Sequence, residues 1–238
     1  MKKFIAEFIG SAFLIATILG TNLLAVSING DSSAGHLAHA LSIGSILTVM
    51  IIIFGPISGG HFNPAVTISF LAKGDINISQ CIQYIIAQSL GAILGAILAN
   101  TMYGYDIISI STVSRSGGGI LLGELIATFG LVLLIHLTLK FKEEAIPYAV
   151  GLFIFAAVSF TSSTAFANPA VSLGRIFSSA PASIAISSAI IFIVVQIIAG
   201  LIAFYVARFL LKKRKLISSY YFIYPDSNLV VLTPNHYN

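Results

Sequence analysis

The chain consists of long runs of apolar residues that are separated by short polar stretches. Six of these runs reach about the 20 residues that an α-helix needs to cross a bilayer. Two further apolar stretches, at about 63–72 and 168–177, are too short to cross and are expected to form half-helices. The pattern predicts an all-α membrane protein with six transmembrane helices and two half-helices. The expected spans are about 4–28, 36–54, 78–100, 120–141, 145–162 and 183–211.

Both short stretches begin with the same triplet, Asn63-Pro64-Ala65 in one and Asn168-Pro169-Ala170 in the other. Asn is a preferred N-cap, and Pro suits the first helical position because its φ is already helical and its missing N–H is not needed there. Irregular backbone at membrane depth is tolerated only where protein buries it or where it lines a wet cavity. We therefore expect each triplet to start a half-helix beside a water-filled path.

The two halves of the chain also resemble each other. The segment Ala6-Glu7-Phe8-Ile9-Gly10-Ser11 is similar to Gly123-Glu124-Leu125-Ile126-Ala127-Thr128. Each half, about 4–100 and 120–211, holds three spans, and because three is odd the second half is expected to be inverted in the membrane. Inverted repeats with broken helices that meet near the midplane are typical of a transport site.

Glu7 and Glu124 lie inside spans at matching positions of this repeat. A carboxylate within a membrane span usually has a function. We expect each to accept hydrogen bonds from the loop that leads into a half-helix, with ion or proton handling as the alternative.

Composition and charge agree with a membrane protein. Of the 238 residues, 57% are hydrophobic and 8% are charged, whereas soluble domains carry about 25% charged residues. The net charge of +4 does not favour nucleic acid as a partner, because the basic residues lie at the membrane edges. Arg115 and Arg175 fall on one side of the six-span arrangement and ten basic residues fall on the other. Those ten are Lys2, Lys3, Lys73, Lys140, Lys142, Arg208, Lys212, Lys213, Arg214 and Lys215.

This bias places both termini in the cytoplasm and the protein in the cell membrane. We expect one channel domain over residues 1–215 and a cytoplasmic tail over 216–238. Met1-Lys2-Lys3 and the apolar run after it resemble a signal peptide, but the run is longer than usual and contains Glu7. The lone Cys81 leaves no disulfide within the chain. Because no nucleophile–base pair, metal cluster or cofactor motif stands out, we expect neither an enzyme nor a bound metal or cofactor.

Two half-helices that enter from opposite faces bring their N-termini together near mid-membrane. Each N-terminus carries a partial positive charge and unpaired N–H groups. Asn63 and Asn168 can cap their own helices through the amide oxygen and turn the amide N–H₂ into the lumen. Such a site suits a neutral molecule with lone pairs and repels cations.

The run Ser58-Gly59-Gly60-His61-Phe62-Asn63-Pro64-Ala65-Val66-Thr67, the second triplet and the segment Ala6 to Gly10 resemble the aquaporin, or major intrinsic protein, family over about residues 4–211. The resemblance implies a right-handed six-helix bundle with two half-helices, a homotetramer with four pores in the lipid bilayer, and passive flow of water or small neutral solutes. His61 is the loop histidine of this pattern. It could pack the loop or gate the flow with pH on the cytoplasmic side.

This sequence departs from the family at one position of the outer selectivity filter. The family usually has Arg directly after the second triplet, and here that residue is Val171. The resemblance maps the other filter positions to Ile43, Ala165 and Val158, although counting back from Asn168 gives Ala156 in place of Val158. These residues are all small or aliphatic, so we expect a wide, apolar constriction.

Two polar residues are expected just outside this constriction, in the outer vestibule. Arg175 lies one helical turn beyond Val171, and His39 lies one turn beyond Ile43. The alternative for Arg175 is a place at the interface or a bond to a loop carbonyl, and for His39 it is an interfacial polar contact.

The pattern Asn-Pro-Ala-Val-Ser-x-x-Arg, preceded by Phe160-Thr161-Ser162-Ser163-Thr164, is similar to a bacterial aquaglyceroporin subgroup associated with arsenic resistance. This resemblance implies passage of arsenite as uncharged As(OH)₃, together with glycerol or other small polyols and water. A water-selective aquaporin and a closed-pore structural relative are the alternatives. A cation channel or coupled transporter is disfavoured, because the expected bracing role of Glu7 and Glu124 leaves no free carboxylate at the midplane.

Overall fold

The computed structural model describes residues 1–29 and 33–212, and within these ranges it is helical and has no strand. Six of its helices are long and apolar enough to cross a membrane. They are α1 (Lys2–Asn29), α2 (Ser33–Ser58), α4 (Ile78–Met102), α5 (Gly118–Phe141), α6 (Ile146–Phe160), which reaches this length only together with the 3₁₀ helix just before it, and α8 (Ile186–Leu211). The short helices are α3 (Pro64–Lys73) and α7 (Pro169–Gly174), with one-turn 3₁₀ helices η1 (Glu143–Ala145) and η2 (Arg175–Phe177). The expected all-α membrane fold is confirmed.

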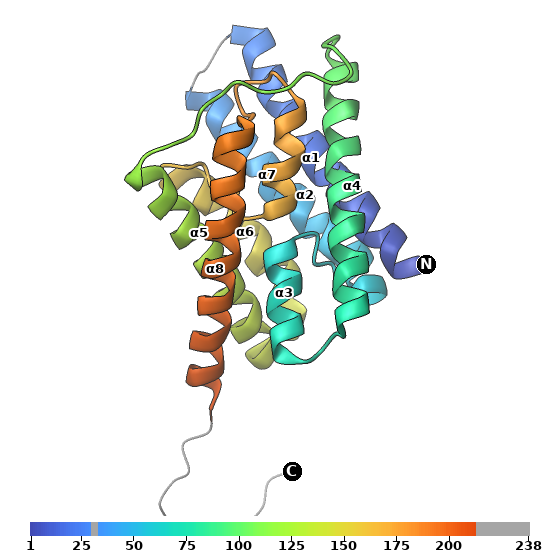
Figure 1. Cartoon of the computed structure of the whole chain (residues 1–238), viewed down its shortest axis with the longest axis vertical. Coiled ribbons are helices and arrows are strands. Elements are labelled where there is room, and N and C mark those ends of the chain that lie inside the picture. The colour runs from blue at the N-terminus through green and yellow to red at the C-terminus, as the bar shows by residue number, and fades with distance from the viewer. Residues whose placement is uncertain (30–32, 213–238) are drawn as a thin grey trace, which may run out of the picture.

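The two short helices lie in opposite halves of the bundle (Figure 1). The view shows α3 in the lower half and α7 in the upper half, among the long helices. Pro64 and Pro169 occupy their first positions, as the triplets predict. Polar side chains that are far apart in the sequence therefore come together where the two N-terminal ends approach each other.

Several helix ends differ from the sequence prediction, and two of them have a clear physical reason. The second span continues to Ser58 and carries Pro56 within its last turns, since a Pro near a helix end removes a single backbone bond and marks only a probable boundary. The second half-helix ends at Gly174, and its last turn tightens into η2. The tail at 216–238 lies outside the described residues.

Close helix packing holds the first half-helix loop in place. A Cβ atom at Gly91 of α4 would collide with the carbonyl oxygen of Phe8 in α1, and one at Gly95 would collide with that of Ala12. Small residues allow such backbone contact between membrane helices. This contact sets the spacing between Glu7 on α1 and Gln88 on α4, both of which are fully buried.

Candidate functional site

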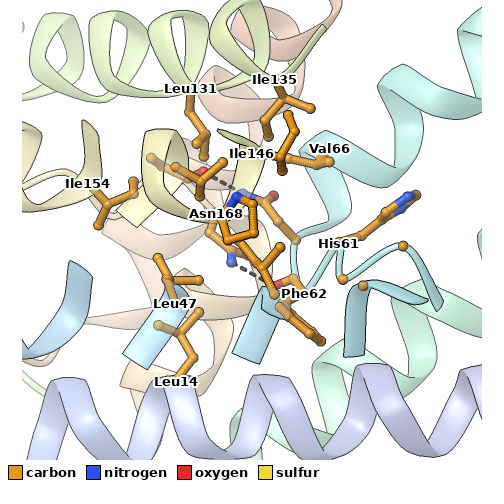
Figure 2. Close-up of a pocket in the computed structure, with 18 of the residues that line it drawn as sticks. Leu14, Leu47, His61, Phe62, Val66, Leu131, Ile135, Ile146, Ile154 and Asn168 are labelled. Atoms are coloured by element: carbon orange, nitrogen blue, oxygen red, sulfur yellow. Dashed lines mark hydrogen bonds between the residues drawn. The ribbon is translucent and has the colours of Figure 1, made fainter. Parts of the chain in front are cut away.

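A cavity of about 530 Å³ passes along the meeting point of the half-helices. Its wall is formed largely by aliphatic side chains, with Leu14 and Leu47 on one side of Asn168 and Leu131 and Ile135 on the other (Figure 2). Glu143, beside the carboxyl end of α5, and Arg175 in η2 also line it. The cavity is therefore a mainly apolar path with a few polar groups at defined places.

The two triplet asparagines each cap their own half-helix. The Asn63 Oδ1 atom accepts a hydrogen bond of 2.9 Å from the Ala65 amide. The Asn168 Oδ1 atom accepts bonds of 2.9 Å from the Ala170 amide and 3.3 Å from the Val171 amide. Both residues have extended backbone, as N-caps do.

The amide nitrogens of the same asparagines join the two loops to each other. Asn63 Nδ2 donates to the Ala167 carbonyl oxygen at 2.8 Å, and Asn168 Nδ2 donates to the Phe62 carbonyl oxygen at 2.8 Å (Figure 2). The sequence did not predict this exchange. Each amide group has two N–H donors, so one is committed to the opposite loop and the other is left for the cavity, which both asparagines line.

Glu7 holds the loop that leads into α3. Its Oε1 atom accepts bonds from the Ser58 hydroxyl at 2.6 Å and the His61 amide at 3.0 Å. Its Oε2 atom accepts bonds from the Phe62 amide at 2.7 Å and Gln88 Nε2 at 2.7 Å. An ionised carboxylate is purely an acceptor, and these four donors occupy both of its oxygens.

Glu124 does the same for the loop that leads into α7. It accepts bonds of 2.9 Å from the amides of Phe166 and Ala167, and one of 2.6 Å from Gln196 Nε2. Both glutamates thus accept hydrogen bonds from the loops that lead into the half-helices, and these bonds fix the positions of the two carboxylates. The sequence reasoning overlooked Gln88 and Gln196, although an amide residue near the middle of an apolar span was a visible signal for each.

The two loops adopt strained backbone conformations. Phe62, Thr164, Ala165 and Ala167 have φ between 45° and 61°, a left-handed region that residues with a Cβ rarely occupy. Such strain persists only where the surroundings impose it. The amides of Phe62, Phe166 and Ala167 are held by the two glutamates, and those of Thr164 and Ala165 donate to the Thr161 carbonyl oxygen and the Ser163 hydroxyl. Residues 59–61 and 164–166 of the two loops line the cavity, and their carbonyl oxygens accept no hydrogen bond from the described residues.

Three of the four predicted filter residues, Ile43, Ala165 and Val171, line the cavity. Val158 is buried at 2% exposure but is not among the lining residues. Ile154, one turn earlier on the same face of α6, lines the wall instead. Of the two candidates for the fifth-span position, Val158 lies on the buried face of α6 and Ala156 is exposed on the outside of the bundle.

Arg175 is buried at 3% exposure and lines the cavity beyond Val171. Its guanidinium carbon lies 3.4 Å from the centre of the Phe166 ring, and its Nε atom donates to the Ala182 carbonyl oxygen. It combines the two expected arrangements, since it faces the cavity and is bonded to a loop carbonyl. It does not extend to the interface.

The repeat gives this stacked pair an equivalent in the first half. Phe70 follows Asn63 by seven residues, as Arg175 follows Asn168. The rings of His61 and Phe70 are stacked with centroids 4.5 Å apart. Equivalent positions of the two halves therefore hold different pairs. The first half has the stacked rings of His61 and Phe70, and the second half has the Arg175 guanidinium over the Phe166 ring.

The two histidines of the predicted site have different surroundings. His61 lines the cavity, and its Nδ1 atom lies 3.2 Å from the Thr67 hydroxyl. Burial lowers the pKa of His61 to about 4, with a smaller contribution from nearby His136. His39 is buried against Thr21, with 2.7 Å between Nδ1 and the hydroxyl oxygen. Because His39 is not among the cavity-lining residues, the polar contact describes it better than the predicted place in the vestibule.

The family model described as "Major intrinsic protein" matches residues 1–143, which is more than half of the chain. The chain belongs to the major intrinsic protein family. Members of this family are membrane channels, so this major intrinsic protein is an integral membrane channel for small solutes.

Relatives of this major intrinsic protein include channels named for glycerol. Aquaglyceroporin AqpS of Rhizobium meliloti is 37% identical over 89% of the chain and 91% of the relative. Glycerol uptake facilitator protein-like 6 of Lactiplantibacillus plantarum is 32% identical over 73% of the chain and 82% of the relative. The solved aquaglyceroporin from Plasmodium falciparum shares the fold, with a TM-score of 0.68 and 22% identity over 86% of this chain and 93% of that one.

Proposed function

We propose that this protein is a passive channel for small uncharged solutes, namely arsenite-type metalloid hydroxides, glycerol and other small polyols, and water. The observation that carries the proposal is the outer end of the cavity. Ile43, Ala165 and Val171 line it with small or aliphatic side chains, and the cation at position 175 lies one turn beyond the usual filter place. A wall of this kind leaves more room than a narrow ring with Arg at position 171.

The polar groups of the cavity suit a solute that both donates and accepts hydrogen bonds. The spare N–H groups of Asn63 and Asn168 meet its oxygens, and the loop carbonyls at 59–61 and 164–166 accept from its hydroxyls. As(OH)₃ and glycerol each carry three hydroxyl groups without a net charge. The free energy of desolvation is therefore far smaller for these solutes than for an ion, and an aliphatic wall cannot compensate for the desolvation of an ion.

Cations meet two further barriers. The N-terminal ends of α3 and α7 each carry roughly half a positive charge, and the Arg175 guanidinium adds a full charge at the outer end. The names of the two bacterial relatives support glycerol as one solute of this chain.

We also propose the arrangement in the membrane. The end of the bundle with Lys2, Lys73 and Lys140 faces the cytoplasm, in the cell membrane, because basic residues favour that side. The outside of the bundle exposes large apolar side chains, among them Ile52, Leu152 and Phe209. They suit contact with lipid and with neighbouring copies in a homotetramer.

The test is solute flux through purified protein in vesicles, followed by light scattering after a gradient of glycerol or arsenite is applied. We expect faster reswelling than in empty vesicles. Val171→Trp, which adds bulk without charge at the outer end, is expected to abolish most of the flux. Equal reswelling with and without protein, for every neutral solute, would refute the channel.

Arg175→Ala tests the displaced cation barrier in the same vesicles. We expect a higher leak of protons and potassium ions with the neutral solute flux maintained. An unchanged leak would limit Arg175 to packing the loop at 181–183.

A further inference from the structure

Two arginines hold three consecutive carbonyl groups at the outer end of the cavity. Arg115 donates from Nη2 to the Pro181 carbonyl oxygen at 3.0 Å and from Nε to that of Ser183 at 2.9 Å. Arg175 donates from Nε to the carbonyl oxygen of Ala182, the residue between them. These two are the basic residues that the six-span arrangement places apart from the other ten.

Both guanidinium groups also lie over one aromatic ring. The guanidinium carbon of Arg175 is 3.4 Å from the Phe166 centroid and that of Arg115 is 5.1 Å from it. Phe166 lines the cavity and donates its amide to Glu124. The ring, the segment 181–183 and the two arginines therefore form one contact group, which we name the outer clamp.

No ion pair among the described residues explains this group, although the buried Glu124 carboxylate acts on both arginines from beyond ion-pair distance. Among residues 1–29 and 33–212, the one ion pair is between Lys73 and Asp75, so neither arginine has a carboxylate partner there. Two like charges at one ring repel each other. Carbonyl oxygens and the ring face compensate for that repulsion, which indicates that the pair is kept for its geometry.

Arg115 is itself well anchored on the connection between α4 and α5. Its amide donates to the Ser188 hydroxyl at 3.0 Å, at the start of α8. Nearby, the Ser111 amide donates to the Ile176 carbonyl oxygen at 2.8 Å, and the Ala185 amide donates to that of Val113 at 2.7 Å. The connection thus holds Arg115 against the segment that carries the Ala182 carbonyl.

We propose that Arg115 is a positioning residue of the outer filter. It fixes segment 181–183 from outside, so that the Ala182 carbonyl holds the Arg175 guanidinium across Phe166 and beside the cavity. A planar guanidinium reaches two carbonyl groups at once through its fork of N–H donors, whereas a lysine ammonium is a point charge on a flexible stem. This proposal rests on the proposed function, because it needs Arg175 to control what passes.

A double-mutant cycle in vesicles tests the coupling of the two arginines. The measured quantity is the ratio of glycerol permeability to proton permeability for Arg115→Ala, Arg175→Ala and the double variant. We expect each single variant to lower the ratio by about tenfold or more, since tenfold is the lower end of what a hydrogen bond to a charged group contributes. The double variant is expected to match Arg175→Ala, since a positioning residue has no effect once the residue that it positions is gone.

Arg115→Lys separates geometry from charge. It keeps the positive charge, so a positioning role predicts a ratio of glycerol to proton permeability close to that of Arg115→Ala. Raising the ionic strength should leave this ratio unchanged. Ser114→Ala, at the exposed neighbouring residue, is the matched control and should behave like the original chain. Size-exclusion profiles and unfolding midpoints report whether each variant folds, and Arg115→Lys alone carries the test if Arg115→Ala does not fold.

The outcomes are distinct. Multiplying effects in the double variant, or recovery of the ratio by Arg115→Lys, would overturn the positioning role and make Arg115 an independent surface charge. An unchanged ratio in Arg115→Ala beside a lowered one in Arg175→Ala would also overturn it. Absence of glycerol flux in the original chain would instead refute the proposed function itself.

Discussion

Replacement of Glu124 by Gln is a direct test of how the second loop is held. Glu124 accepts bonds from the Phe166 amide, the Ala167 amide and Gln196 Nε2. A Gln amide offers a single oxygen, so one buried backbone N–H loses its acceptor at a cost of about 1–3 kcal/mol. The two bonds that remain lose their charge assistance, about 1 kcal/mol each. We therefore expect the free energy of unfolding to fall by roughly 3–5 kcal/mol.

The assay is the thermal unfolding midpoint of purified protein in detergent. In a chain of this size each kcal/mol shifts the midpoint by about 2–4 °C, so we expect a fall of roughly 10 °C. Glu143→Gln makes the same chemical change at an exposed residue and should stay within about 0.5 kcal/mol of the original chain. In vesicles, Glu124→Gln should lower water and glycerol flux together, because the loop main chain lines the path of both.

Equal midpoints for Glu124→Gln and Glu143→Gln would refute this reasoning. They would mean that packing alone, without the carboxylate, holds the strained residues Ala165 and Ala167. A selective loss of glycerol flux with a normal midpoint would refute it as well, because it would assign Glu124 to the conduction path.

Val171→Arg should narrow the outer end and cut glycerol flux more than water flux, and equal losses in a vesicle assay would show that position 171 is away from the constriction. His61 has a pKa of about 4, so solute flux should stay level between pH 7.5 and 5, and a step near pH 6 would contradict a neutral ring over that range. Because the unfolded chain protonates His61 near its ordinary value of 6.5, the free energy of unfolding should fall as the pH drops from about 6.5 towards 4. Phe166→Leu should raise proton leak by removing the ring under Arg175, and a leak equal to that of the original chain would show that the ring is dispensable.

Much of this architecture was predictable because it repeats. The paired triplets at Asn63 and Asn168 mark helix starts through local capping chemistry, and the matching places of Glu7 and Glu124 indicate a shared partner. Each of these predictions depends on a short sequence interval or on a comparison of two halves, so no knowledge of distant packing was needed.

Predictions that crossed an irregular loop were less successful. Between Val158 and Asn168 the chain leaves the helix at Phe160 and passes through left-handed residues, so counting residues alone could not decide between Val158, which is buried, and Ala156, which is exposed. His39 was placed by its helix face, but helical spacing does not reveal that Thr21 of α1 would bind the ring. In the outer clamp, the bonds from Arg115 to residues 181 and 183 join segments about 70 positions apart. No local sequence pattern predicts these bonds.

The exchange of hydrogen bonds between the two asparagines has a consequence for how the chain is made. Asn63 and Ala167 are 104 positions apart, and Asn168 and Phe62 are 106 apart. During synthesis the first three spans are made before Ala167, so Asn63 can form its bond to the Ala167 carbonyl only after most of the second half has been added. Completion of the pore is therefore a late step of biogenesis.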